Sequence, residues 1–217
     1  MPQALITWGG WPGHEPEKVA HLFAGWLREA GVDVTVTDTL ACFDDPEAIK
    51  TLDLIVPVWT MSEIAKEQAI NVAAAVAAGT GLAGCHGGMC DAFRANVDWQ
   101  FLTGAQWVAH PGNDGVEYRV RVTSDHETVA GLPDFDVKSE QYYLHVDPAV
   151  KVHAVCDFPV VEGPHTVNGP VAMPVVFTKG WGEGRVYYNA LGHQANVIDH
   201  GVPAQMLKRG LLWAMRR

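Results

Sequence analysis

The sequence lacks the basic surface that nucleic acids and anionic membranes require. Its 217 residues include 15 Lys and Arg against 25 Asp and Glu, which leaves a formal net charge of −10. Adjacent basic residues occur only as two pairs near the end of the sequence, Lys208-Arg209 and Arg216-Arg217. Since both kinds of partner bind positively charged faces, we expect neither nucleic acid nor membrane as a partner.

Charged residues are also scarce, and hydrophobic residues are not. Only 18% of the residues are charged, whereas 48% are hydrophobic. This composition excludes a disordered chain or a coiled coil and is typical of a globular protein with a sizeable core. The length and the absence of any linker-like stretch favour a single domain over residues 1–217.

Several catalytic motifs are missing. The only serines are Ser62, Ser124 and Ser139, and none has the flanking glycines of a serine-hydrolase elbow. No Walker A motif is present, and neither His-Glu pair is completed to the H-E-x-x-H motif of zinc proteases. These absences exclude the most common serine hydrolases, P-loop enzymes and zinc proteases.

The first residues show neither the basic region nor the apolar core of a secretion signal, and the sequence contains no paired cysteine motif and no long membrane-like run. Its four cysteines form no C-x-x-C pair. The longest uncharged stretch, residues 69–90, contains five glycines, which suits a helix end, a turn and a buried strand better than a membrane span. We therefore expect a cytoplasmic protein with free thiols.

What the sequence does contain is an alternation of apolar strands and amphipathic helices. In the first half, helices at 16–31 and about 62–78 separate strands, a pattern that predicts a mainly parallel sheet covered on both faces. The second half has alternating strands, a hairpin with a glycine-rich loop, and a closing helix at about 203–216. The predicted strands lie at 4–8, 32–37, 53–59, 81–85, 117–122, 150–155, 174–177 and 185–189.

The strongest chemical signal is the turn Gly84-Cys85-His86-Gly87-Gly88. It follows the fourth predicted strand and precedes a helix that we expect to begin near Met89. Such an elbow lifts its central side chain above the sheet edge and directs the amides of Gly87 and Gly88 at a ligand. A histidine beside a helix N-terminus should stay neutral near pH 7, which suits a base or a metal ligand. The alternative is a buried histidine among glycines that serve only packing.

Other candidate residues also follow predicted strand ends, where open parallel sheets bind their ligands. Carboxylate and imidazole groups that converge there serve proton transfer or bind Zn²⁺ or another divalent ion. We take His86, Glu140 and His193 as candidate catalytic residues or metal ligands. Candidate substrate-binding residues are Trp11, His14, Gly87, Gly88, His110 and Tyr142.

Taken together, these segments resemble the trehalose-utilisation (ThuA-like) family. The resemblance rests on the glycine-rich start with His14, the Gly-Cys-His-Gly-Gly turn, His110-Pro111, the Glu140-Gln-Tyr-Tyr run, the segment 184–193 and the closing 209–214. It implies a flavodoxin-like, class I glutamine-amidotransferase-like three-layer sandwich with an added antiparallel hairpin. In that superfamily the elbow carries a nucleophilic cysteine, and a later histidine is followed two residues on by glutamate. Here His86 and Ala195 occupy those positions, so glutaminase activity is not expected.

The resemblance also implies a role in the catabolism of disaccharides or keto-sugars. We expect an enzyme, an isomerase, lyase or hydrolase, that uses histidine acid–base chemistry with or without a divalent metal such as Zn²⁺. The expected partners are a sugar-type small molecule and, in a homo-oligomer, further copies of the chain. The alternative is a non-catalytic sugar-binding or regulatory module on the same scaffold.

Overall fold

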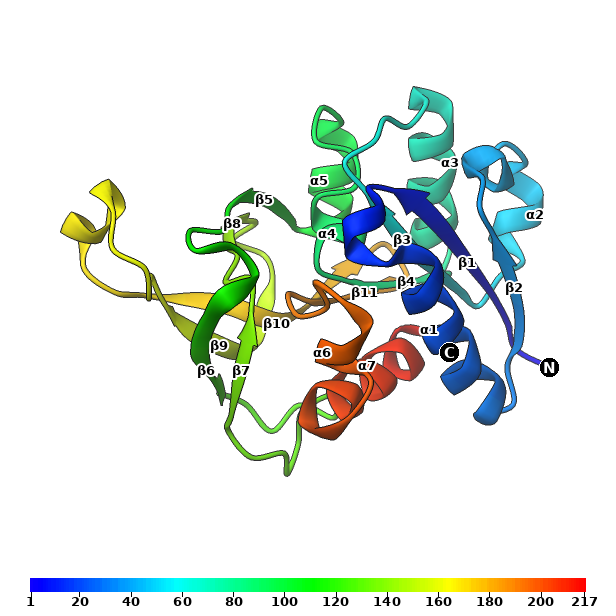
Figure 1. The fold of residues 1–217 in the computed structure, drawn as a ribbon. Coiled ribbons are helices and arrows are strands. Elements are labelled where there is room, and N and C mark those ends of the chain that lie inside the picture. The colour runs from blue at the N-terminus through cyan, green and yellow to red at the C-terminus, as the bar shows by residue number, and fades with distance from the viewer.

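A computed structural model describes residues 1–217, and it contains one large mixed sheet flanked by helices (Figure 1). The sheet has nine strands in the order β2-β1-β3-β4-β11-β10-β9-β6-β7, and a separate two-stranded sheet pairs β5 with β8. Its strands are β1 Gln3–Gly10, β2 Asp33–Thr37, β3 Leu54–Thr60, β4 Gly81–Cys85, β6 Val116–Val122, β7 Phe135–Ser139, β9 Lys151–Phe158, β10 Val171–Trp181 and β11 Gly184–Asn189; the small sheet is β5 Ala105–Ala109 and β8 Tyr143–Val146.

The sheet divides into a parallel half and an antiparallel half. β2, β1, β3, β4 and β11 run parallel to their neighbours, whereas β11, β10, β9, β6 and β7 pair antiparallel. The shared strand β11 therefore joins the two halves. The antiparallel half extends away from the helices, and the helical turn Pro164–Asn168 lies at its far tip (Figure 1).

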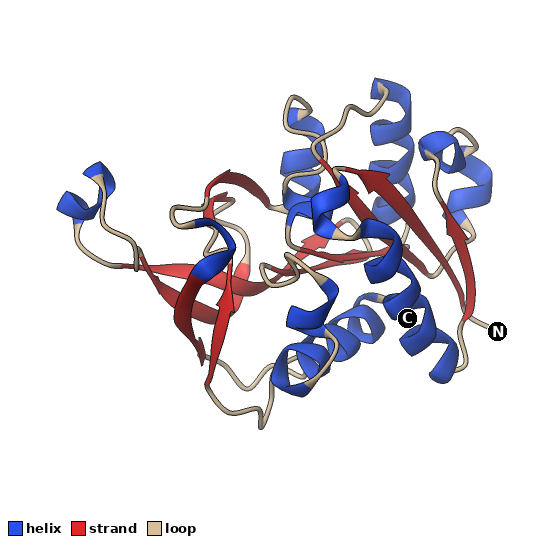
Figure 2. Ribbon diagram, viewed as in Figure 1, coloured by secondary structure: helices blue, strands red, loops and turns tan.

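Helices cover both faces of the parallel half (Figure 2). The chain moves from β1 outward to β2 through α1, but from β3 in the opposite direction to β4 through α3. Because such crossovers are right-handed, α1 and α3 lie on opposite faces. Helices α6 and α7 contact α1, and α2 and α5 contact α3. The helices are α1 Pro16–Glu29, α2 Pro46–Lys50, α3 Lys66–Ala77, α4 Gly87–Cys90, α5 Val97–Thr103, α6 Ala195–Ile198 and α7 Gly201–Ala214.

One hydrophobic cluster of 54 buried residues runs through both halves of the sheet. Phe177 on β10 and Tyr188 on β11 pack with ring centroids 5.0 Å apart at the junction. All four cysteines are free, and the Cys85 thiol is buried in this cluster, as expected for a core residue. The helices are all too short or too polar to cross a membrane.

The predicted strands of the parallel half agree with the structure to within two residues at each end, but the helix predicted over 62–78 begins only at Lys66. The amides of Met61 and Ser62 donate instead to the carbonyls of Asp91 and Ala92 at 2.9 and 2.8 Å. This pairing holds the start of the segment against the loop after α4, and the helix begins after Ala65, whose amide donates to Oε1 of Gln68 at 3.2 Å.

Three further expectations needed correction. The helix expected from Met89 is the single turn α4, and a separate helix, α5, begins at Val97. The predicted hairpin is not an addition to the sheet, because β11 pairs parallel with β4 and the hairpin continues into three further antiparallel strands. Its loop is short, since β10 continues to Trp181 and β11 begins at Gly184. The sequence did not predict α2, β7 or β8.

Candidate functional site

The candidate site lies at the edge of the parallel sheet where β1, β4 and β11 end. Because these strands are parallel, the residues that follow them emerge at the same edge. β1 leads to His14, β4 leads directly to His86, and β11 leads to His193. Glu140 belongs to the antiparallel half of the sheet and directly follows β7.

His86 occupies a strained turn. Its backbone has φ 48° and ψ −141°, a conformation that non-glycine residues rarely adopt. Its amide donates to the carbonyl of Asn189 at 2.7 Å, and its carbonyl accepts from the Tyr188 hydroxyl at 3.2 Å. The turn also needs a small neighbour, because a Cβ at Gly84 would lie 2.9 Å from the Cβ of Met89. The predicted elbow is therefore present.

The His86 ring is enclosed rather than open to a ligand. Nδ1 lies 2.8 Å from the carbonyl oxygen of Ala190, Nε2 lies 3.0 Å from Oε2 of Glu140, and the ring stacks on Tyr142 at 3.9 Å between centroids. The residue is 1% exposed. Burial lowers the pKa of His86, against the opposing effect of Glu140, and so favours the neutral ring. The cause is burial, whereas the sequence suggested the N-terminus of a helix.

Glu140 is the centre of the cluster. The Tyr118 hydroxyl donates to its backbone carbonyl at 3.0 Å and fixes the residue after β7. From its carboxylate, the nearest imidazole nitrogens of four histidines are 3.0 to 3.9 Å away: His86 Nε2 at 3.0, His193 Nδ1 at 3.3, His110 Nδ1 at 3.4 and His14 Nε2 at 3.9 Å. No other carboxylate of the protein has such a surrounding.

The carboxylate of Glu140 is held in its charged form. Burial raises its pKa, but the neighbouring His193 and His86 imidazoles more than offset this and hold the pKa well below its usual range. Glu140 therefore provides a fixed negative charge at the floor of the site near pH 7.

His14 is positioned by a neighbouring strand and by a glycine beneath it. Its Nδ1 lies 3.0 Å from Oγ1 of Thr60, the last residue of β3. A Cβ at Gly87 would lie 2.6 Å from Cε1 of the His14 ring, so Gly87 leaves room for the imidazole. Burial, assisted by the nearby His86, lowers the pKa of His14 to about 3. The ring is therefore neutral at physiological pH.

Above the cluster is an open cavity of about 460 Å³. Six of the predicted residues line it, namely Trp11, His14, His110, Glu140, Tyr142 and His193. His86, Gly87 and Gly88 do not. Gly87 packs under His14 and Gly88 packs against the backbone of Val58, and α4 is a single turn. The two glycines therefore serve close packing and do not form part of the cavity wall.

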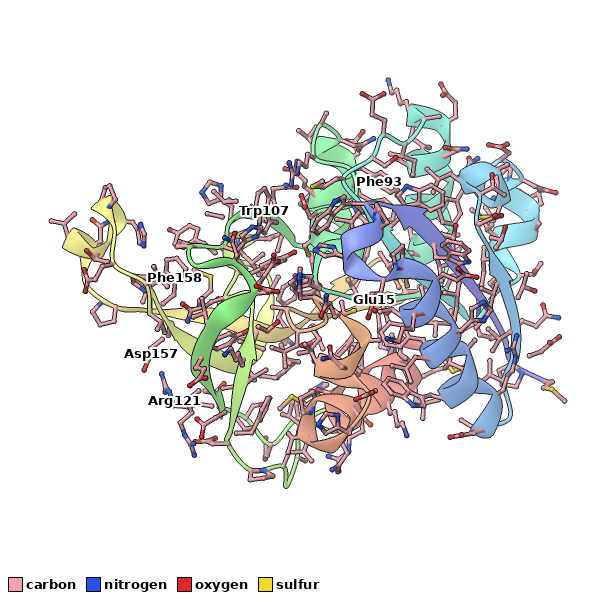
Figure 3. All side chains as sticks on the ribbon, in the orientation of Figure 1. Glu15, Phe93, Trp107, Arg121, Asp157 and Phe158 are labelled. Carbon is pink, nitrogen blue, oxygen red and sulfur yellow. The ribbon has the colours of Figure 1, made fainter.

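Half of the residues that line the cavity carry no signal that the sequence patterns revealed. Arg94 forms an ion pair with Asp91, at 2.9 Å between Nη2 and Oδ2, and its guanidinium lies 4.3 Å from the ring centre of Trp107. Trp107 in turn donates from Nε1 to Nδ1 of His110 at 3.1 Å, and it lies on β5 between the two halves of the molecule (Figure 3). The missed residues are Met61, Asp91, Arg94, Trp107, Asn113 and Asp114.

Glu15 is a further missed residue that connects two site loops. Its carboxylate accepts a hydrogen bond from the amide of Ala195 at 3.0 Å, and the residue lies at the start of α1 near the centre of the view (Figure 3). This bond ties the loop of His14 to the loop of His193. The left-handed backbone of Glu15, with φ 47°, gave no signal in the sequence.

The cluster has the composition of a metal site. His14, His86, His193 and Glu140 are all buried, and one ligand atom from each lies within 4.8 Å of the others. Imidazole nitrogen and carboxylate oxygen are common ligands of Zn²⁺ and related divalent ions.

Comparisons with solved structures agree with this fold. A ThuA-like protein from Bacteroides uniformis superposes with a TM-score of 0.74 at 17% identity, over 98% of this chain and 91% of that one. A ThuA-like protein from Parabacteroides merdae gives 0.69 at 17% identity, over 99% and 90%. A β-galactosidase from Bacillus circulans sp. alkalophilus gives 0.61 at 13% identity, over 98% of this chain but 30% of that one. Among curated proteins, none matches the sequence.

The fold and the site together define an α/β protein with a histidine–glutamate cluster at the carboxyl edge of a parallel sheet. The sequence model of one family, described as trehalose utilisation, matches residues 3–214. The chain therefore belongs to the ThuA family, as the sequence resemblance indicated.

Proposed function

We propose that this protein is an enzyme of carbohydrate catabolism that binds a disaccharide or keto-sugar in the cavity above Glu140. The observation that carries the proposal is the convergence of four imidazoles on one buried carboxylate at the base of an open cavity. The family description, trehalose utilisation, supplies the substrate class. We further propose that the scaffold is of the class I amidotransferase-like type.

The cavity wall suits a sugar. Trp11 is 41% exposed and Trp107 lines the same cavity, so each offers an apolar ring to the C–H groups of a pyranose. Asp91, Arg94 and Asn113 also line it and offer charged and amide groups to hydroxyls. A cavity of about 460 Å³ lies in the range of small-molecule sites.

Proton transfer falls to the cluster residues that face the cavity. His193 lines the cavity and lies beside the Glu140 carboxylate, which would stabilise the imidazolium formed when the ring accepts a proton. His86, enclosed beneath Tyr142, then acts as a positioning residue for Glu140. Removal of a proton beside a sugar ketone fits this set, since it needs a base but no nucleophile.

A glutaminase mechanism does not fit. The only thiol at the elbow is Cys85, and burial raises its pKa to about 12, so that it is not a thiolate near neutral pH. A metal ion bound to Nδ1 of His193 would leave the proton on Nε2, so this ring would then no longer act as the base; the ion would instead assist the sugar chemistry by polarising a carbonyl or hydroxyl oxygen.

The test is hydrogen exchange on keto-sugars in D₂O, followed by NMR. We expect deuterium to appear beside the carbonyl with the wild-type protein and to be lost with His193→Gln. His21→Gln is the matched control, because His21 is exposed on α1 and does not line the cavity. Exchange that is undiminished in His193→Gln would contradict the proposed base.

A non-catalytic sugar-binding module is the second candidate. It is favoured by the enclosure of His86, whose ring is fully engaged by Ala190, Glu140 and Tyr142. The wild-type protein and the His193→Gln variant also distinguish the enzyme from the binding module. Quenching of tryptophan fluorescence by a sugar, without exchange or turnover, would support binding alone.

A further inference from the structure

We propose that His14, His86, His193 and Glu140 bind one divalent transition-metal ion of the Zn²⁺ type. The proposal concerns the same cluster as the proposed function, but it does not depend on a sugar. It rests on the hydrogen-bonding state of each ligand atom as well as on the grouping of the four residues.

The His86 ring gives the first argument. The Ala190 carbonyl can only accept, so Nδ1 of His86 carries the proton of that 2.8 Å hydrogen bond. In the neutral ring, Nε2 then presents a lone pair, and it faces the Oε2 carboxylate oxygen of Glu140 at 3.0 Å. Two acceptors at this distance repel unless a cation lies beside both of them. A metal-bound histidine typically makes this same pairing, with its other nitrogen donating to a backbone carbonyl.

His193 gives the second argument. Its Nδ1 is buried and has no hydrogen-bond partner, although it lies 3.3 Å from Oε1 of Glu140. Its side chain is 9% exposed. A buried nitrogen without a partner is costly, and a metal ion on its lone pair would satisfy it.

His14 completes the set from the opposite side. The Thr60 hydroxyl, itself 1% exposed, occupies Nδ1 at 3.0 Å, which leaves Nε2 as the free nitrogen toward Glu140 at 3.9 Å. Thus two of the three rings, His14 and His86, have one nitrogen fixed by an outer partner and the other directed at the carboxylate. This is the usual way in which proteins orient imidazole ligands.

The spacing suits a small ion. Four ligands about 2.0–2.1 Å from a tetrahedral centre lie about 3.3 Å apart. The nitrogens of His86 and His193 already lie 3.0 and 3.3 Å from the Glu140 oxygens. Since all four ligand atoms lie within 4.8 Å, ion binding needs a contraction of the widest pair by roughly 1.5 Å at most. Three imidazoles with one carboxylate favour Zn²⁺ or Co²⁺ over Mg²⁺ or Ca²⁺.

His110 provides a matched control within the same site. It is as near to Glu140 as the proposed ligands, at 3.4 Å, but the nitrogen that faces the carboxylate already accepts the Trp107 indole N–H. That lone pair is occupied, and the side chain is 29% exposed. We therefore exclude His110 from the ligand set.

The experiment is titration of chelator-treated, untagged protein with Co²⁺, followed by visible absorption, and with Zn²⁺, followed by calorimetry. We expect one ion per chain. We expect metal affinity to fall more than about 100-fold in each of four single variants, His14→Gln, His86→Gln, His193→Gln and Glu140→Gln. This exceeds the loss that follows removal of a residue which only hydrogen-bonds a metal ligand. His110→Gln should change the affinity no more than a few-fold.

Circular dichroism and thermal unfolding of each variant establish that it is folded, and any one folded ligand variant suffices for the test. Absence of stoichiometric uptake by the wild-type protein would overturn the proposal and would mean that a proton bridges His86 and Glu140. Equal losses in His110→Gln and in the four ligand variants would overturn the ligand set. The two proposals fail separately: metal uptake needs no sugar, and keto-sugar exchange without metal uptake would leave the proposed function in place.

Discussion

Oε2 of Glu140 lies 3.0 Å from Nε2 of His86, and the other nitrogen of that ring lies 2.8 Å from the carbonyl oxygen of Ala190. The three residues come from three parts of the chain, after β7, β4 and β11. The contact therefore joins the antiparallel half of the sheet to the carboxyl edge of the parallel half. It makes the cluster a product of the complete fold.

Replacement of the Glu140 carboxylate by an amide should leave the stability of the protein nearly unchanged but strongly reduce its activity. In Glu140→Gln the amide can donate to the lone pair of His86, so we expect the free energy of unfolding to stay within about 1 kcal/mol of wild type. The negative charge that stabilises an imidazolium is lost, so kcat/KM on a responsive keto-sugar should fall more than about 100-fold. Denaturant unfolding and steady-state kinetics measure the two effects. Glu140→Ala, which leaves Nε2 of His86 without a partner, should be less stable than Glu140→Gln.

Gly87 can be tested as the space that His14 requires. A methyl group at this position would lie 2.6 Å from Cε1 and 2.8 Å from Nδ1 of the His14 ring. We expect Gly87→Ala to displace the ring, to cost about 1–3 kcal/mol of stability and to impair the site. Gly25→Ala is the matched control, since nothing lies within 4 Å of its Cβ position in α1 and helix propensity favours alanine. The control should be stabilised by about 0.5–1 kcal/mol. Equal behaviour of the two variants in thermal unfolding would contradict the packing argument.

Trp11 should contribute to ligand binding more than to folding. Its ring is 41% exposed, lines the cavity and meets the His14 ring edge to face at 4.8 Å between centroids. We expect Trp11→Ala to weaken sugar binding at least about 10-fold, with little change in the unfolding midpoint. Val97→Ala, at a position that is 71% exposed and outside the cavity, should leave binding unchanged. Calorimetric titration with the best ligand of the exchange assay supplies the affinities.

His153 should make stability depend on pH. Burial, with contributions from His126 and Lys151, lowers its folded-state pKa to about 4 from the ordinary value of 6.5. Between these values the unfolded chain binds the proton and the folded chain does not. The contribution of His153 to stability is therefore complete above pH 6.5 and is lost progressively as the pH falls toward 4.

The measurement is urea unfolding at several pH values between 7.5 and 4.5, with His153→Gln as the variant. This variant loses the hydrogen-bonding contacts of the ring with Ser124 and Thr178, at 3.0 and 2.8 Å, so it should be less stable than wild type at pH 7. Its stability should nevertheless decline less steeply with falling pH. His21→Gln, at an exposed position, should keep the wild-type slope; a parallel decline in all three proteins would count against the buried histidine.

Local sequence determined the elements of the parallel half and their order. Continuous apolar strands bounded by glycine, and helices with one apolar stripe, specify a buried parallel sheet because backbone and side-chain preferences act over a few neighbouring residues. The same reasoning located His86 at an elbow and placed His14 and His193 just beyond strand ends. It did not place the start of α3, which follows a segment that is held by hydrogen bonds from the amides of Met61 and Ser62 to the distant carbonyls of Asp91 and Ala92.

Tertiary structure decided which of these residues meet and what each one faces. The approach of Glu140 to His86 cannot be read from the order of the residues in the sequence. It depends on the pairing of β11 with both β4 and β10, which joins the two halves of the sheet. Nor does it show that Trp107 occupies a nitrogen of His110, or that His86 is enclosed beneath Tyr142. Residue types and strand ends are local properties and can be read from the sequence. Burial, hydrogen-bond partners and the resulting charge states depend on contacts between remote segments, and only the folded chain fixes them.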